Sequence, residues 1–407
     1  MNEAYQEVVT AAVGVDVSTG QPAALREAIG RAEQLRRMDL VAWLCARLGD
    51  VAFGTEGVAA ANHAYDRGHT ADPLAVGPWV GRAQVAVATK EFDNWDRAMR
   101  VIRDQVGEEA DPELVLRGVA LLDVDRVRTH GADQASTWRV SATELEDAGA
   151  VWAAWHVWMA GVSALAHRDA WVALEAACEG AMLLATRHGL ARGAIWACLE
   201  LCQHLRACER PAEADLRVCG ALELAEQLGD PDIVDLVLRM GCDLSTELGQ
   251  ATALIDRLRL RASVATSRGR SADQVGFLHQ AFLAASRSQR PDAGSLGEEL
   301  VETLLAAGMG AVPGLDVEAL TGELARLGVL DHARQLALAA SQWAFGQGRR
   351  GQAAQRLVDA ARYALLDQDR DEARAMFDEA IRVSQSFGLD LHRPWQDERR
   401  QLFGPKP

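Results

Sequence analysis

The chain has little of what nucleic-acid-binding and membrane-spanning proteins need. Among its 42 basic residues only Lys90 and Lys406 are lysines, and 58 acidic residues bring the formal net charge to -16. An acidic excess opposes binding to a phosphate backbone, which needs clustered basic side chains. The most apolar stretch, Ala150 to Ala166, contains His156 and is short for a membrane span. We therefore expect neither a nucleic-acid partner nor a membrane anchor.

Signals for secretion and for disulfides are also missing. Glu3 and Glu7 stand where a secretion signal would carry positive charge, and no apolar segment follows them. The number of cysteines is odd, at 7, and six of them lie between Cys178 and Cys242 within helical patterns. A disulfide framework is not expected of such a set. We expect a cytoplasmic protein, and the scarcity of lysine beside plentiful arginine, alanine and glycine is typical of a GC-rich bacterial genome.

The chain contains none of the common catalytic motifs. It has no glycine-rich phosphate loop, no His-Glu-x-x-His zinc helix and no Gly-x-Ser-x-Gly nucleophile turn. Cys198, Cys202, His204 and Cys208 lie close in sequence, but Cys198 and Cys202 are one helical turn apart on an apolar face, where cysteine packs as a small hydrophobe. We therefore expect no metal, no cofactor and no enzymatic activity.

Glycines recur with a period of about forty residues and predict a regular series of helix ends. Glycine is favoured just past a helix because the left-handed backbone conformation found there costs it little. Three Asp-Pro pairs, at Asp72, Asp111 and Asp230, suggest helix starts, with the aspartate as the N-cap. The predicted stops are Gly68, Gly107, Gly149, Gly189, Gly229, Gly269, Gly308, Gly348 and Gly388.

Small side chains on one helical face precede these glycines and predict close helix packing. Ala333, Ala337 and Ala340 are spaced by four and three residues, which places them on one side of an α-helix. The same spacing holds at Ala373, Phe377 and Ala380, at Ala214, Val218 and Ala221, and at Leu174, Cys178 and Ala181. Because no segment alternates like a strand, the sequence predicts an all-α fold of about nine stacked helix pairs.

The order alanine, bulky residue, alanine resembles the second helix of tetratricopeptide repeats. The resemblance is clearest over Gln352 to Gly388, in which Ala373, Phe377 and Ala380 match that helix. The first helix of the family is matched by Leu357, Ala360, Ala361 and Ala364.

Three departures from that family set this chain apart. Its unit is about 40 residues long instead of about 34, Ala364 stands where the family often has an aromatic residue, and the closing proline is absent. The long unit looks more like the tetratricopeptide arrays of bacterial regulators and signalling ATPases. The resemblance implies an α-solenoid of antiparallel helix pairs in a right-handed superhelix, whose concave groove is lined by the first helix of each pair.

The residues expected to bind a partner are assigned from this resemblance and from one tryptophan-rich helix. Trp152, Trp155 and Trp158 lie three residues apart, and aromatic residues are enriched in binding hot spots. Two interpretations stay open for them, a partner anchor or packing within the core. For the groove residues the alternative is solvated helix surface. The expected partner-binding residues are Trp79, Asp123, Arg126, Trp155, His156, Trp158, Met159, His167, Gln203, Arg206, Arg239 and Asp243.

The predicted organisation is an N-terminal helical cap over residues 1–50, a tetratricopeptide-like array over 51–388, and a C-terminal cap and tail over 389–407. The leading functional hypothesis is a non-catalytic scaffold or adaptor that binds a peptide or a partner domain in its groove. A second hypothesis is a regulator whose solenoid changes shape when a peptide or small ligand binds. A cryptic enzyme is the third. The tryptophan-rich face is also compatible with a homo-oligomer.

Overall fold

The chain forms two compact helical units. The computed structural model describes residues 2–17, 21–109, 111–130, 137–168, 170–312 and 314–404. Unit 1 is Met1–Asp230 and unit 2 is Pro231–Pro407. The described residues form helices joined by turns, with no strand among them. The predicted all-α class is therefore confirmed, while the cap boundaries predicted near residues 50 and 388 stay predictions.

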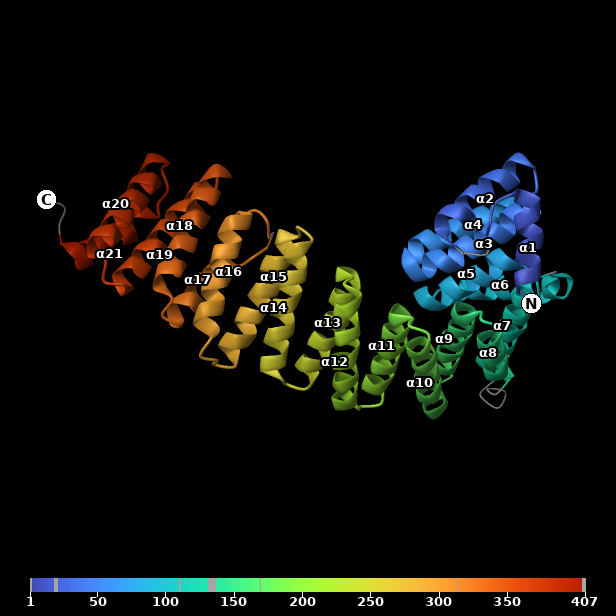
Figure 1. Ribbon diagram of the computed structural model, residues 1–407. Helices are drawn as coiled ribbons and strands as arrows, with labels where there is room; N and C mark the ends of the chain where they lie inside the picture. The colour runs from blue at the N-terminus through green and yellow to red at the C-terminus, as the bar shows by residue number, and fades with distance from the viewer. Residues whose placement is uncertain are drawn as a thin grey trace. The chain divides into compact units, whose positions relative to one another are not determined.

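The helices of unit 1 (Figure 1) are α1 (Asn2–Val13), α2 (Pro22–Gln34), α3 (Met38–Thr55), α4 (Val58–Ala71), α5 (Val76–Thr89), α6 (Phe92–Gln105), the short 3-10 helix η1 (Val106–Glu108), α7 (Pro112–His130), α8 (Thr137–Asp147), α9 (Val151–His167), α10 (Trp171–Arg187), α11 (Ala191–Ala207) and α12 (Pro211–Leu228). Those of unit 2 are α13 (Pro231–Glu247), α14 (Ala251–Ser267), α15 (Ser271–Arg287), α16 (Ala293–Ala307), α17 (Val317–Arg326), α18 (Leu330–Gly346), α19 (Arg350–Leu366), α20 (Arg370–Ser386) and α21 (His392–Phe403).

In unit 2 most helices pack on the next one along the chain (Figure 1), and α16 packs on α18. The predicted seam residues Ala333 and Ala337 of α18 are fully buried, as are Ala373 and Phe377 of α20. Small side chains at these positions let the backbones of adjacent helices approach closely. The tetratricopeptide-like helix pair predicted from these seams is therefore confirmed in the structure.

Most of the predicted glycine stops adopt the left-handed conformation. Gly348 and Gly388 have φ of 74° and 65°, and the stops from Gly149 to Gly308 also have positive φ. Gly68 is an exception, because it lies inside α4. A Cβ atom there would lie 2.9 Å from Pro78 Cγ, so this glycine allows a close helix contact and does not end a helix.

Two other sequence signals in unit 1 differ from the structure in detail, although α6 does end at Gln105, just before Gly107. Gly107 lies within η1, and Asp72 follows α4 as its C-cap and does not cap α5, which begins at Val76. The Asp-Pro signal at Asp111 is confirmed, since its Oδ1 accepts a hydrogen bond of 2.9 Å from the backbone N–H of Glu113. Of these two Asp-Pro pairs, the one at Asp111 therefore marks the start of a helix and the one at Asp72 marks the end of one.

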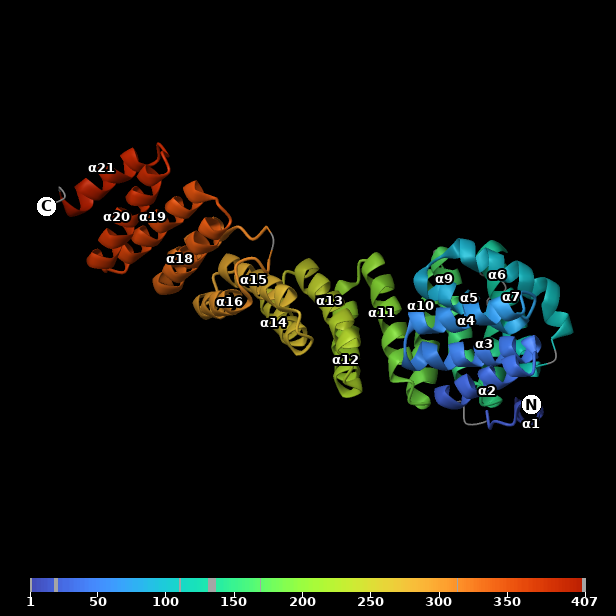
Figure 2. The same cartoon turned by 90° about the horizontal axis from the view of Figure 1, so that it is seen from above.

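Unit 1 contains helix contacts that a simple row of pairs would lack. Helix α5 packs on its neighbours α4 and α6, and also on α3, α7 and α9. Figure 2 shows α3, α4 and α5 side by side. In a repeat array each unit ordinarily contacts only its neighbours. The additional contacts of α5 bring the N-terminal helices against the tryptophan-rich helix α9.

A buried ionic cluster joins α3 to α7 beneath these contacts. Arg117 donates to both carboxylate oxygens of Asp50, at 2.6 Å and 3.0 Å. Arg47 pairs with Asp111 at 2.7 Å and with Glu113 at 2.5 Å. Because buried charges lose their hydration, they are tolerated only when paired in this way. The cluster therefore holds α3 and α7 in one relative position.

Candidate binding cavity in unit 1

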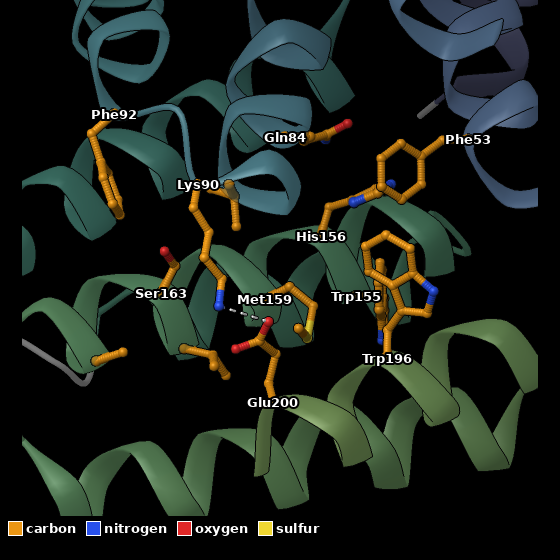
Figure 3. Close-up of a pocket in the computed structure, with 13 residues that line it drawn as sticks. Phe53, Gln84, Lys90, Phe92, Trp155, His156, Met159, Ser163, Trp196 and Glu200 are labelled. Atoms are coloured by element: carbon orange, nitrogen blue, oxygen red, sulfur yellow. Dashed lines mark ion pairs between the residues drawn. The ribbon is translucent and has the colours of Figure 1, made fainter. Parts of the chain in front are cut away.

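A cavity of about 230 Å³ lies in unit 1 where α5 and α9 meet (Figure 3). Its walls come from α3, α5, α9 and α11 and from the turn and first residue that lead into α6. An apolar cavity of about 150 Å³ already holds a benzene-sized ligand, so this one has room for a larger group. The lining residues are Phe53, Gln84, Val87, Lys90, Phe92, Trp155, His156, Met159, Val162, Ser163, Ala166, Trp196 and Glu200.

Aromatic rings form one end of the cavity. The ring of Phe53 stands edge-on to that of His156, with centroids 4.7 Å apart, and its centroid is 6.1 Å from Trp196. Figure 3 shows these three rings gathered on the same side, with Met159 beside them. Flat apolar surfaces with a thioether are well suited to hold an apolar group of a ligand.

Two buried polar side chains at this end have hydrogen-bonding atoms without a partner. Neither Oε1 nor Nε2 of Gln84 has a hydrogen-bond partner within the described part of the chain, and neither does Nε2 of His156. Gln84 is 3% exposed and His156 is 4% exposed. Buried polar atoms in folded proteins are nearly always paired, because an unpaired one destabilises the fold. Such atoms beside an apolar cavity are typical of a ligand site.

Burial keeps the His156 imidazole neutral. The loss of hydration lowers the pKa of His156 to about 3, although the nearby Asp50 carboxylate acts in the opposite direction. A neutral imidazole offers one donor and one acceptor nitrogen. His156 therefore gives the aromatic end of the cavity a polar group that is uncharged.

Lys90 and Glu200 place a charge pair at the other end of the cavity. Lys90 is the left-handed C-cap of α5, with φ of 60°. Its ammonium lies 3.5 Å from Glu200 Oε1 and donates to Gln203 Oε1 at 3.1 Å (Figure 3 shows the ion pair). Both partners belong to α11, so the lysine links the end of α5 to α11 beside the cavity.

The structure places three of the expected binding residues, Trp155, His156 and Met159, in the cavity wall. Trp158 lies elsewhere, with its ring edge-on to Trp138 at 5.1 Å and packed over Gly180 on α10. Trp155 packs against Gly193 of α11, where the missing Cβ leaves room for the indole. The successive tryptophans of α9 therefore have different surroundings.

The remaining expected binding residues of unit 1 are dispersed. Trp79 is buried, and its indole donates to the carbonyl of Pro73 at 2.8 Å. Asp123 and Arg126 form an ion pair of 2.7 Å with each other. Gln203 and Arg206 lie on α11, and Gln203 alone reaches the cavity region, through Lys90.

Two expected binding residues belong to unit 2, and one lies outside the described side chains. Arg239 and Asp243 are exposed on α13, and Arg239 lies 3.5 Å from Asp235. His167 ends α9, and its side chain is not among those described. A groove lined by the first helix of each pair stays a prediction.

Most residues of the cavity wall could not be predicted from the sequence. Phe53, Gln84, Trp196 and Glu200 gave no local signal, because the cavity forms only when α3 and α5 fold against α9 and α11. Lys90 carried the one usable signal, as one of two lysines in an arginine-rich chain.

The described residues include no group of three or more histidine, cysteine or acidic side chains placed to hold a metal ion. Cys198 and Cys202 are buried in α11, and their thiols donate to the backbone carbonyls of Arg217 and Ala214. All seven cysteines are free thiols. Within the described ranges, no helix combines the length and the apolar character that crossing a bilayer requires.

Comparisons with known proteins give similarities of structure alone. No protein-family model and no curated protein matches the chain. The apo form of RapI is similar, with 9% identity over 86% of this chain and 98% of that one, and a TM-score of 0.46. A Rap protein complexed with competence and sporulation factor shares 9% identity over 85% and 98% of the two chains, with a TM-score of 0.36. The TPR domain of P58(IPK) shares 14% over 89% and 98%, with a TM-score of 0.24.

Proposed function

We propose that this protein is a non-catalytic adaptor that captures a short peptide segment by inserting one apolar side chain of it into the cavity of unit 1. The observation that carries the proposal is the pairing of an apolar cavity with the unpartnered polar atoms of Gln84 and His156. An occupant that satisfies these atoms gains hydrogen bonds and apolar contact together. The cavity thus supplies one anchor point for a binding partner.

The cavity also suits an anchor in size. Its volume of about 230 Å³ accommodates one large side chain and part of the adjoining backbone, not a whole folded domain. Anchors of this kind contribute most of the affinity in many interfaces because they fill a desolvated pocket. Residues around the mouth then add contacts that exclude water from the anchor.

The groups in the cavity are poorly matched to acid–base catalysis. A general base works best when its pKa lies near the working pH, and the pKa of His156 is lowered to about 3 by burial. Ser163 lies in the same wall, but no hydrogen bond joins it to His156 within the described chain. The chemistry therefore favours binding over turnover.

A peptide selection tests the proposal directly. A display library of short random peptides is panned against the full chain, and the enriched peptides are measured by fluorescence anisotropy. Ala166→Phe fills the cavity at an exposed lining position, and Ala176→Phe is the matched control at an exposed position of α10 outside the cavity. We expect Ala166→Phe to weaken binding by about tenfold or more and Ala176→Phe to leave it unchanged. Equal binding by both variants contradicts the proposal.

A regulatory role is a second candidate, and the lysine contact favours it. Lys90 joins the end of α5 to Glu200 and Gln203 of α11 beside the cavity. An occupant that contacts both helices shifts the population toward the spacing that fits it. Hydrogen exchange of the α5 and α11 amides, with and without a selected peptide, tests this role. Slower exchange in both helices supports it, whereas protection confined to residues that touch the peptide supports a passive adaptor.

A further inference from the structure

The aromatic end of the cavity includes the side-chain amide of Gln84. Gln84 reaches from α5 toward the end where His156 and Phe53 lie (Figure 3), and both its oxygen and its nitrogen lack a partner within the described chain. A carboxamide presents a donor beside an acceptor in one plane. Both atoms are buried within the cavity wall, so a ligand reaches them when the Gln84 side chain turns toward the cavity. A primary amide can then pair with it through two parallel hydrogen bonds, and Gln84 is complementary to an amide.

The charges around the cavity favour an uncharged ligand. The Lys90 ammonium is already within reach of Glu200 and Gln203, and the Lys90–Glu200 pair has no net charge. Burial lowers the pKa of His156 to about 3, so its imidazole adds no positive charge near neutral pH. A carboxylate placed beside Gln84 and His156 would lose its hydration without gaining a counter-ion, which is costly. The same argument disfavours an ammonium group at that end.

The apolar walls of the cavity indicate which group the ligand carries beside its amide. Phe53, Trp196 and Met159 supply aromatic and thioether surface next to the two polar groups. A flat or branched apolar group can contact these walls while an adjoining amide reaches Gln84. A ligand with only one of these two parts would leave either the walls or the amide unsatisfied.

We propose that the cavity is specific for an uncharged amide ligand with an apolar, preferably aromatic, body, and that Gln84 pairs with an N–H and a C=O that this ligand presents side by side. This inference rests on the proposed function and names the chemistry of its site. A free carboxamide of a small molecule carries both groups itself. A peptide presents them from the two amides that flank one extended aromatic residue, because the N–H and C=O of a single trans amide point in opposite directions. Gln84 is the residue that determines specificity, and the apolar walls supply affinity.

Small molecules that share an aromatic body and differ in their polar group test whether the cavity prefers an amide. Phenylacetamide, phenylacetate and ethylbenzene share an aromatic body and differ in the polar group, and N-acetylphenylalanine methylamide represents the peptide source. Binding to the full chain is measured by calorimetry and by quenching of tryptophan fluorescence, since Trp155 and Trp196 line the cavity. We expect phenylacetamide to bind about tenfold or more tightly than phenylacetate or ethylbenzene, because a buried polar group is satisfied only by the amide.

Variants of Gln84 assign the preference to this residue. Gln84→Met keeps the length of the side chain and removes its hydrogen bonds, and Gln227→Met is the matched control at an exposed position of α12. We expect Gln84→Met to lose the preference for the amide while retaining ethylbenzene binding, which also reports that the cavity is folded. The control keeps the wild-type order of affinities. Tighter binding of the methylamide than of phenylacetamide assigns the site to a peptide, and the reverse order assigns it to a small molecule.

Several results would overturn the inference. Tighter binding of phenylacetate that is lost in Lys90→Met would assign the site to an anion. Equal binding of ethylbenzene and phenylacetamide, unaffected by Gln84→Met, would leave an apolar anchor site and so preserve the proposed function without the amide specificity. Binding of neither amide also contradicts the inference, whereas the proposed function is decided separately by the peptide selection and the Ala166→Phe variant.

Discussion

Arg117 and Asp50, which lie far apart in the sequence, form a doubly hydrogen-bonded ion pair in which the arginine side chain is 2% exposed. The pair joins α7 to α3, and Tyr65 Oη donates a further hydrogen bond of 2.9 Å to the same carboxylate. Asp50 also acts on His156 electrostatically. The ionic cluster therefore lies next to the candidate cavity.

Removing the arginine of this pair should strongly destabilise the protein. We expect Arg117→Met to lower the free energy of unfolding by about 3–5 kcal/mol, because the Asp50 carboxylate is left without its arginine partner and keeps only the hydrogen bond from Tyr65. The exposed pair of Arg26 and Glu56 provides the control, and Arg26→Met should cost less than about 1 kcal/mol. Urea unfolding followed by circular dichroism measures both. If the double variant Arg117→Met, Asp50→Asn recovers none of the loss, the unpaired charge is not its cause.

The buried imidazole of His156 should make stability depend on pH. Burial lowers its pKa to about 3 in the folded protein, whereas an unfolded histidine has a pKa of about 6.5. Between these values the unfolded chain binds one more proton, so stability is present above pH 6.5 and falls as the pH decreases toward 3. The contribution is about 1.4 kcal/mol per pH unit. We expect His156→Phe to reduce the slope by this amount between about pH 6 and pH 4, as measured by urea unfolding at each pH. An unchanged slope would contradict a buried neutral imidazole.

Replacing Gln84 by an apolar residue of similar length should stabilise the unliganded protein. Both polar atoms of its side chain are buried and have no hydrogen-bond partner among the described residues, and such groups cost about 1–3 kcal/mol in desolvation. We expect Gln84→Met to raise the free energy of unfolding within that range. Thermal melts and urea titrations in the absence of ligand measure the change. A loss of stability would show that the Gln84 side chain contributes to folding, and the amide specificity assigned to it would lose its support.

Alanine substitutions at a glycine of α9 and at a glycine of α12 should change the stability of the protein in opposite directions. A Cβ atom on Gly161 would lie 2.5 Å from the ring of Trp138, which is fully buried, whereas Gly220 faces open space. We expect Gly161→Ala to cost about 1–3 kcal/mol through overpacking and Gly220→Ala to stabilise α12 by about 0.5–1 kcal/mol. Parallel urea titrations of the two variants test this. Similar effects of both substitutions would mean that Trp138 moves easily.

The repeat architecture was predictable because its signals are local. Glycine spacing and the seams at Ala333, Ala337 and Ala373 depend on helix geometry and on contact between adjacent helices, so they can be read along the chain. The predictions failed at Gly68, where close contact with Pro78 of α5 places a glycine inside α4, and at Asp72, which ends α4 and does not begin α5. Three of the twelve expected binding residues line the cavity, all of them on the tryptophan-rich helix α9.

The sequence by itself determined the class of fold, the helix period and the absence of common catalytic motifs, since each follows from spacing or residue type. Only the tertiary structure decided that Gln84 of α5, His156 of α9 and Trp196 of α11 share one cavity. Their proximity depends on the packing of α5 against helices that are not its neighbours. A periodic pattern specifies which face of a helix is buried, but it does not specify which distant helix will cover that face.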